Sequence, residues 1–205
     1  MKANANTVIE DGDLVLVPYR REHVAKYHEW MLSPELRELT ASEPLSLEEE
    51  YEMQRKWQED EDKLTFIVCI RDTTSGASVS RSFDPANLQM IGDVNLFLKG
   101  VPADEDFEAE VEIMIAEPDF RGKGYAARAL QMMLSYATSP SSPAPLPVPP
   151  DRLVARIGES NESSIRLFKK LGFEITKRVT VFQEVEMRFR GSMESWNAGG
   201  VGAYS

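Results

Sequence analysis

The chain has 205 residues, which is enough for one well-packed domain and short for two. Its composition, 42% hydrophobic and 28% charged, is that of an ordinary globular protein. The formal net charge of -11 argues against a nucleic-acid partner, because phosphate binding needs a basic surface. No apolar stretch approaches the roughly twenty residues of a membrane span, so no membrane partner is expected. A single cysteine excludes a disulfide framework and, without a visible signal peptide, predicts a cytoplasmic location.

The first half of the chain predicts strands that flank two helices. Pro18 closes a short aliphatic run, and Ser46 with Glu49 forms the capping-box pattern that starts a helix. Residues 71–88 are polar and predict a loop. The expected elements are a strand at 14–17, helices at 22–32 and 47–58, and strands at 66–70 and 90–98.

The second half alternates between strand and helix patterns. Residues 139–150 hold six of the twelve prolines and predict an extended, solvated connector. The glycine-rich end, residues 191–205, lacks periodicity and is expected to be disordered. The expected elements are strands at 109–116, 153–157, 173–176 and 179–189, and helices at 127–137 and 163–171. This order predicts an α/β (α+β) fold in which helices pack on a mixed central sheet.

The most informative segment joins the strand at 109–116 to the helix that follows it. Its glycines let the backbone bend toward a ligand, and the first N–H groups of a helix attract an anion. A Walker loop needs four residues before its Gly-Lys pair, and a dinucleotide fingerprint needs an acidic residue about twenty positions on; the chain has neither. The segment reads Arg121, Gly122, Lys123, Gly124, Tyr125, Ala126.

Two motifs in this order resemble those of a known superfamily. Arg121-x-x-Gly124-x-Ala126 resembles the acyl-CoA signature of the GNAT N-acetyltransferases, and residues 161–173, NESSIRLFKKLGF, resemble their second motif. Further segments, at 16–31, 39–45, 57–60 and 181–185, resemble the N-acetyltransferase 9-like family. The resemblance implies one GNAT domain over residues 1–190, with 138–150 as an inserted proline-rich loop.

The resemblance also implies acetyl-CoA as co-substrate. Its pyrophosphate would lie on the N–H groups of residues 122–126. Its pantetheine would lie between the strands at 110–116 and 153–157, against the backbone of Ile113, Met114 and Ile115. Asn161 and Ser164 of the second motif would face the cofactor as well. Asn161 is equally well placed to cap the following helix, and both roles can hold.

The chemistry that the resemblance implies is direct attack of an amine on a thioester, which needs a proton acceptor. Glu110 and Glu112 are the candidate catalytic residues, because they alternate onto one face of their strand and burial would raise a carboxylate pKa there. A solvated strand face is the alternative interpretation. Many relatives place a tyrosine acid where this chain has Phe168, so the proton donor must come from elsewhere or be water.

The acceptor is expected to be an α-amino group of a protein or peptide. An α-amine has a pKa near 7.7–8.0, against about 10.4 for lysine, so it needs less help to become neutral. The alternatives are a small-molecule amine, or an acetyl-CoA-binding interaction module without turnover. Family resemblance alone suggests tubulin or microtubules as partner.

Two further expectations concern charged side chains in the first half of the chain. The acidic runs at 48–50 and 59–62 are expected to be solvated, or else to contact the cationic end of a peptide substrate. No metal is expected, because His23 and His28 are five positions apart on a helix and have no cysteine nearby.

Overall fold

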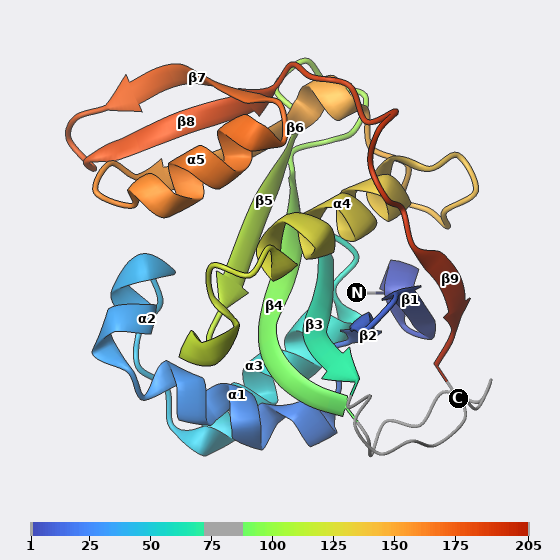
Figure 1. The fold of residues 1–205 in the computed structure, drawn as a ribbon, viewed down its shortest axis with the longest axis vertical. Helices are drawn as coiled ribbons and strands as arrows, with labels where there is room; N and C mark the ends of the chain where they lie inside the picture. Colours follow the sequence, from blue (N-terminus) through green and yellow to red (C-terminus); the bar gives the residue numbers. More distant parts are fainter. Residues whose placement is uncertain (1, 72–87, 205) are drawn as a thin grey trace.

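The computed structural model describes residues 2–71 and 88–204. Across these residues the strands form one nine-stranded sheet in the order β7-β8-β6-β5-β4-β3-β2-β1-β9 (Figure 1). Only the β5–β6 pair is parallel among them, so the prediction of a mixed sheet flanked by helices is confirmed. The strands are β1 (Thr7–Asp11), β2 (Leu14–Pro18), β3 (Lys63–Arg71), β4 (Leu88–Lys99), β5 (Glu108–Ile115), β6 (Leu153–Gly158), β7 (Phe173–Val179), β8 (Glu184–Phe189) and β9 (Gly200–Ala203).

Helices cover both faces of the sheet. Those of the described residues are α1 (Val24–Met31), α2 (Pro34–Leu39), α3 (Leu47–Glu59), α4 (Tyr125–Thr138) and α5 (Glu162–Lys170). One buried cluster joins α4 and α5 to the sheet, and a second joins α1 and α2 to the opposite face. The alternation of β5 follows this division, because Val111 belongs to the first cluster and Met114 to the second. Figure 1 shows α4 crossing the middle of the sheet, with β7, β8 and α5 gathered in one half of the molecule.

The sheet opens between its two central strands. The β5–β6 register holds only two pairs, Ala109 with Leu153 and Glu110 with Val154, although both strands continue beyond them. Figure 1 shows the two strands diverging. On the other side of β5, pairing with β4 continues to Ile115, and a Cβ added at Gly92 would lie 1.9 Å from the carbonyl oxygen of Met114. Gly92 therefore lets β4 and β5 stay together while β6 departs.

The end of the chain corrects an expectation, because Gly200–Ala203 form a strand within the segment that was predicted to be disordered. Strand β9 pairs antiparallel with β1, from Thr7 with Ala203 to Glu10 with Gly200. Tyr204 is buried, and its hydroxyl donates to Glu22 at 3.1 Å. The sequence gives no sign of this strand because its residues are mostly glycine and alanine. The open edge of β1, which the sequence prediction also missed, supplies the hydrogen-bonding partners.

The proline-rich segment is also more tightly held than expected. Residues 139–149 form no helix or strand, but Leu146 and Val148 are buried in the α4 cluster. The N–H of Val148 donates to the carbonyl oxygen of Ala137 at 2.9 Å. The segment is therefore a mostly exposed connector, as predicted, that is anchored to the core by two apolar side chains between the prolines.

The remaining predictions hold with small changes. The Ser46–Glu49 capping box starts α3, as predicted. The expected strand at 179–189 is interrupted by a turn at residues 180–183. Its first residue ends β7, and its second part is β8. The predicted polar loop at 71–88 lies almost entirely outside the described residues. Among the described residues, no helix combines the length and the apolar character needed to cross a membrane.

Candidate functional site

The glycine turn presents exposed backbone at the start of α4. Gly122 and Gly124 have φ angles of +71° and +87°, which an L-residue adopts only with strain. A Cβ at either position would meet nothing within 4 Å, so the turn faces open space. Gly124 is the N-cap of α4, and residues 121–124 are exposed. The N–H groups from Gly122 to Ala126 are therefore available to an anion at the positive end of a helix.

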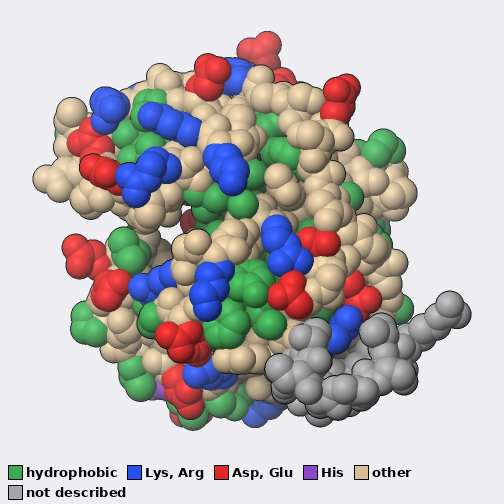
Figure 2. Space-filling model, in the orientation of Figure 1, with side chains coloured by type: hydrophobic (Ala, Val, Ile, Leu, Met, Phe, Trp, Pro, Cys, Tyr) green, Lys and Arg blue, Asp and Glu red, His purple; other side chains and the backbone are tan. Residues whose placement is uncertain are grey.

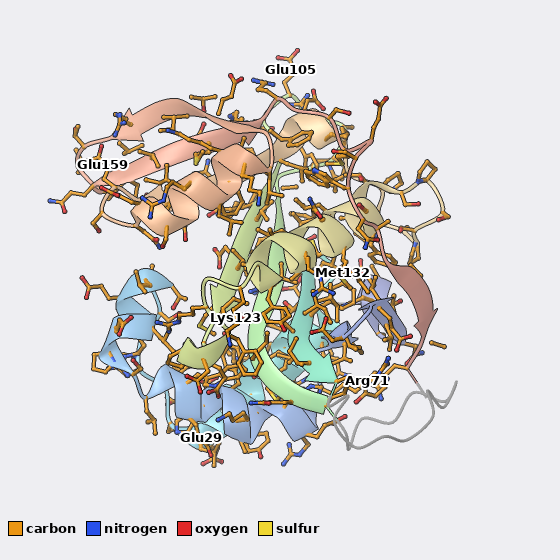
Figure 3. All side chains as sticks on the ribbon, viewed as in Figure 1. Glu29, Arg71, Glu105, Lys123, Met132 and Glu159 are labelled. Atoms are coloured by element: carbon orange, nitrogen blue, oxygen red, sulfur yellow. The ribbon has the colours of Figure 1, made fainter. Side chains whose placement is uncertain are left out.

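The two cations of the turn differ in how they are held. Arg121 donates from Nε to the carbonyl oxygen of Ile115 at 2.9 Å and from a terminal nitrogen to that of Ala116 at 3.2 Å. These bonds connect the turn to the end of β5. Arg121 also forms a 3.3 Å ion pair with Glu35 on α2. Lys123 lies on the turn itself, over the ring of Phe120 (Figure 3). Among the described residues, Lys123 makes no side-chain hydrogen bond or ion pair, unlike Arg121.

The opposite side of the opening is built by β6 and α5. Asn161 caps α5, because its side-chain oxygen accepts from the N–H of Ser164 at 3.1 Å and from the Ser163 hydroxyl at 3.0 Å. The capping role predicted for Asn161 is confirmed, and the cofactor role stays a prediction. Figure 2 shows a hollow between the half with β7, β8 and α5 and the half with α1 and α2. In Figure 3, Glu159 marks the first half and Lys123 the approach to α4.

Glu110 is engaged in ion pairs at the point where β5 and β6 separate. It is buried, its Oε2 accepts from Lys99 at 2.5 Å, and it also pairs with Arg156 of β6. Arg156 is shared with Glu108 and Glu186. These two ion pairs hold the Glu110 carboxylate to Lys99 of β4 and Arg156 of β6. The cluster joins the two strands below the opening.

Glu112 lies two residues beyond the last β5–β6 pair and has a different environment. Glu112 is an exposed residue, yet surrounding protein atoms partly desolvate its carboxylate. Desolvation raises the pKa of Glu112 to about 7, and the charges of Glu110 and Asp93 add to the rise. Lys99 and Lys63 partly oppose it. A raised pKa suits a general base, and the catalytic role of Glu112 stays a prediction.

Asp93 is a buried carboxylate on the face of the sheet that carries Glu112. It was not predicted from the sequence. It lies on β4 opposite Met114, is 2% exposed, and accepts from Asn95 at 2.6 Å through one oxygen. Its other oxygen has no hydrogen-bond partner. Burial raises the pKa of Asp93 to about 7. The alternation Asp93-x-Asn95 within an apolar run was the sequence signal that could have identified this pair.

Beyond β4 and β5, a cavity of about 220 Å³ lies among α1, α3 and the segment before α3. Glu50 lines it and is 2% exposed, so the expectation that the acidic run 48–50 is solvated is wrong for this residue. The helix period explains the difference, because Glu50 faces α1 while its neighbours face solvent.

Phe168 is part of the core and not of the opening. It is 2% exposed and its ring packs edge-on against Phe173, with centroids 5.0 Å apart. Within residues 2–71 and 88–204, no group of three His, Cys, Asp or Glu side chains is arranged to hold a metal ion.

Comparison with known proteins identifies this architecture. The acetyltransferase (GNAT) domain profile matches residues 13–174. The chain is 48% identical over 187 residues to the alpha/beta-tubulin-N-acetyltransferase 9 of Drosophila melanogaster, covering 91% of this chain and 88% of the relative. It is 47% identical to the human protein of the same name, covering 92% and 85% of the two chains. An N-acetyltransferase 9-like protein of Schizosaccharomyces pombe is 42% identical, covering 91% and 97%.

Solved structures agree on the fold. A spermidine N-acetyltransferase from Vibrio cholerae, in complex with CoA and spermine, aligns with a TM-score of 0.66 at 20% identity, covering 87% of this chain and 94% of that one. A ribosomal L7/L12 alpha-N-protein acetyltransferase aligns at 0.67 and 15%, covering 90% and 94%.

The chain belongs to the GNAT acetyltransferases and, within them, to the N-acetyltransferase 9-like family, as its motifs predicted. It is an acetyl-CoA-dependent acyltransferase.

Proposed function

We propose that this enzyme acetylates the α-amino group of a protein or peptide. The observation that carries the proposal is the environment of Glu112. This residue lies on β5 just beyond its last pair with β6, and its pKa is about 7. A base of this strength can take a proton from an α-amine, with a pKa near 7.7–8.0, far more readily than from lysine, near 10.4. The acceptor would approach from the face that carries Glu112, Asp93 and α1.

The chain's own groups fit acetyl-CoA, which would supply the acetyl thioester. The exposed N–H groups of the glycine turn, with Lys123, would hold the pyrophosphate. The backbone of Ile113, Met114 and Ile115 lies on the stretch of β5 that is no longer paired with β6, and it would hydrogen-bond the pantetheine amides. A backbone N–H of this stretch would also stabilise a developing oxyanion.

The proton has a defined path on the acceptor side. Glu112 would accept it from the attacking amine, while Glu110 remains paired with Lys99 and Arg156. Because Phe168 is buried and cannot donate, the leaving sulfur would take its proton from water or another group. This arrangement predicts that kcat/KM rises as pH increases through about 7, since Glu112 must be ionised to act.

The test compares three acceptors under the same conditions. One is a library of peptides with free α-amines, another is the same library with blocked α-amines and an internal lysine, and the third is spermidine. We expect transfer to the first group, at rates that fall in Glu112→Gln. Activity on lysine peptides alone would contradict the proposal, and tight acetyl-CoA binding without transfer would favour an interaction module.

The names of the relatives suggest tubulin as the natural acceptor. Two of them are called alpha/beta-tubulin-N-acetyltransferases and cover more than nine-tenths of this chain. Purified tubulin, incubated with the enzyme and acetyl-CoA and then analysed by mass spectrometry, would show which amine is modified. A cytoplasmic location, predicted from the single cysteine, stays a prediction.

A further inference from the structure

The cavity among α1 and α3 has the dimensions of a subsite for one side chain. Its volume is about 220 Å³, below the roughly 300–1,000 Å³ of sites that enclose a whole drug-sized ligand. Its lining combines aromatic, flexible apolar and acidic groups and contains no cation. The lining residues are Tyr27, Met31, Ser42, Glu43, Leu45, Glu50, Met53 and Trp57.

Glu50 is the least satisfied group in this lining. Its side chain is 2% exposed, and its Oε2 has no hydrogen-bond partner. Its basic neighbour is His28, whose Nδ1 lies 3.9 Å from Oε1, beyond hydrogen-bonding distance, and this nitrogen has no hydrogen-bond partner either. Burial raises the pKa of Glu50, and the neighbouring His28 only partly opposes the rise. Burying a carboxylate in this way costs free energy unless a positive group pairs with it.

The other walls also suit a cation with a long apolar stem. Tyr27 and Trp57 contribute aromatic rings to the lining, and Lys63, 4.9 Å from the Trp57 ring centroid, shows that this ring accepts a cation. Met31 and Met53 offer flexible, polarizable contacts to a methylene chain. Glu43, an exposed residue, adds a second carboxylate to the lining.

The cavity adjoins the face on which transfer is proposed. Tyr27 lines it, and the charges of Asp93, Glu50 and Glu112 all act on the Tyr27 hydroxyl. Trp57, another wall, contacts the ring of Phe97 at 5.9 Å between centroids, and Phe97 lies opposite Glu110 in the β4–β5 register. Tyr27 is therefore near both the cavity and the carboxylates of Asp93 and Glu112.

We propose that this cavity is a specificity subsite for a cationic side chain, guanidinium or ammonium, within the first residues of the acceptor, and that Glu50 recognises its charge. The inference rests on the proposed function, since it assumes a peptide acceptor. Tyr27 and Trp57 would flank the bound group, and Glu43 would contribute a weaker, solvent-screened attraction.

The test uses matched peptides that differ in one charge. Each carries arginine or its neutral isostere citrulline at one of positions one to four, with a lysine and norleucine pair as a second arm. At the recognised position we expect arginine to exceed citrulline in kcat/KM by roughly 10- to 100-fold. In Glu50→Gln this ratio should fall to near one, and peptide affinity measured by calorimetry should fall in parallel.

Control variants separate recognition from folding. Glu52→Gln removes a similar charge from the same helix but outside the cavity lining, so the ratio should stay at its wild-type value. If Glu50→Gln does not fold, Met53→Lys places an ammonium in the cavity and should abolish the preference in its place. A wild-type enzyme that acetylates arginine and citrulline peptides equally at every position would overturn the subsite. A failure to acetylate any peptide would instead contradict the proposed function.

Discussion

The two sides of the opening differ in what holds them together. The acetyl-CoA side consists of backbone: a glycine turn with positive φ angles, the N-terminus of α4 and an edge of β5 left free where β6 departs. The acceptor side consists of side chains, with Glu112, Asp93 and Glu50 brought together from β5, β4 and α3. Under the proposed function, a local segment would bind the cofactor, whereas contacts between distant parts of the chain would tune the acceptor side. Substitutions on the two sides should then have separable effects.

The largest expected effect is on the acceptor side, in Glu112→Gln. Loss of a general base lowers kcat/KM by roughly 10²- to 10⁴-fold, while acetyl-CoA affinity should stay near the wild-type value because the backbone site is untouched. Steady-state kinetics with a peptide acceptor and calorimetry with acetyl-CoA measure the two quantities. Glu110→Gln is the matched comparison. It should lose less activity and about 1–2 kcal/mol of stability, since it leaves Lys99 and Arg156 without their partner. Equal losses of activity in both variants would remove the distinction between the two glutamates.

On the cofactor side, Gly124→Glu should weaken acetyl-CoA binding by at least about 100-fold. The change introduces a negative charge where a pyrophosphate is proposed and a side chain where φ is +87°. Gly124→Asn is the control, because asparagine tolerates this backbone conformation without adding charge, and it should retain most of the affinity. Calorimetry with acetyl-CoA decides between them. Undiminished affinity in Gly124→Glu would overturn the assignment of the turn.

A smaller effect concerns how stability depends on pH on the acceptor side. The pKa of Asp93 is raised to about 7 in the folded protein, above its ordinary value of 3.8. Between these values the folded state holds a proton that the unfolded state has lost, so the stabilising contribution is complete below about 3.8 and disappears as pH rises through about 7. The free energy of unfolding of the wild-type protein should therefore fall between pH 4 and 8. In Asp93→Asn this fall should be smaller by on the order of 1–3 kcal/mol. Denaturant titrations across this range measure it. A wild-type profile that rises with pH, and keeps its slope in the variant, would contradict the burial argument.

The smallest expected effect is on stability. It concerns the edge strand β9, which belongs to neither the cofactor side nor the acceptor side. Tyr204→Ala removes a ring that stacks 4.0 Å from the Arg20 guanidinium and a hydroxyl bound to Glu22. We expect a loss of about 1–2 kcal/mol in the free energy of unfolding. Acetyl-CoA affinity and kcat should not change. Hydrogen exchange of β1 should quicken in the variant, and unaltered protection there would mean that β9 contributes little.

The comparison also shows how far local sequence patterns predict this molecule. The capping box at Ser46, the glycine turn, the Asn161 cap and the alternation of β5 are all encoded by neighbouring residues, and each was predictable. Glu110 and Glu112 share one strand pattern, yet only one is neutralised by a guanidinium, contributed by Arg156, 46 positions further on. No local pattern could separate them.

The sequence by itself determined the family, the mixed sheet and the place of the glycine turn, because short-range backbone preferences and hydrophobic periodicity are written in contiguous residues. Tertiary structure alone decided which carboxylates are buried, paired or left without a partner. The same holds for β9, whose glycine-rich residues become a strand only because β1 offers an open edge. Electrostatics and edge pairing depend on what lies nearby in space, and those neighbours come from distant parts of the chain.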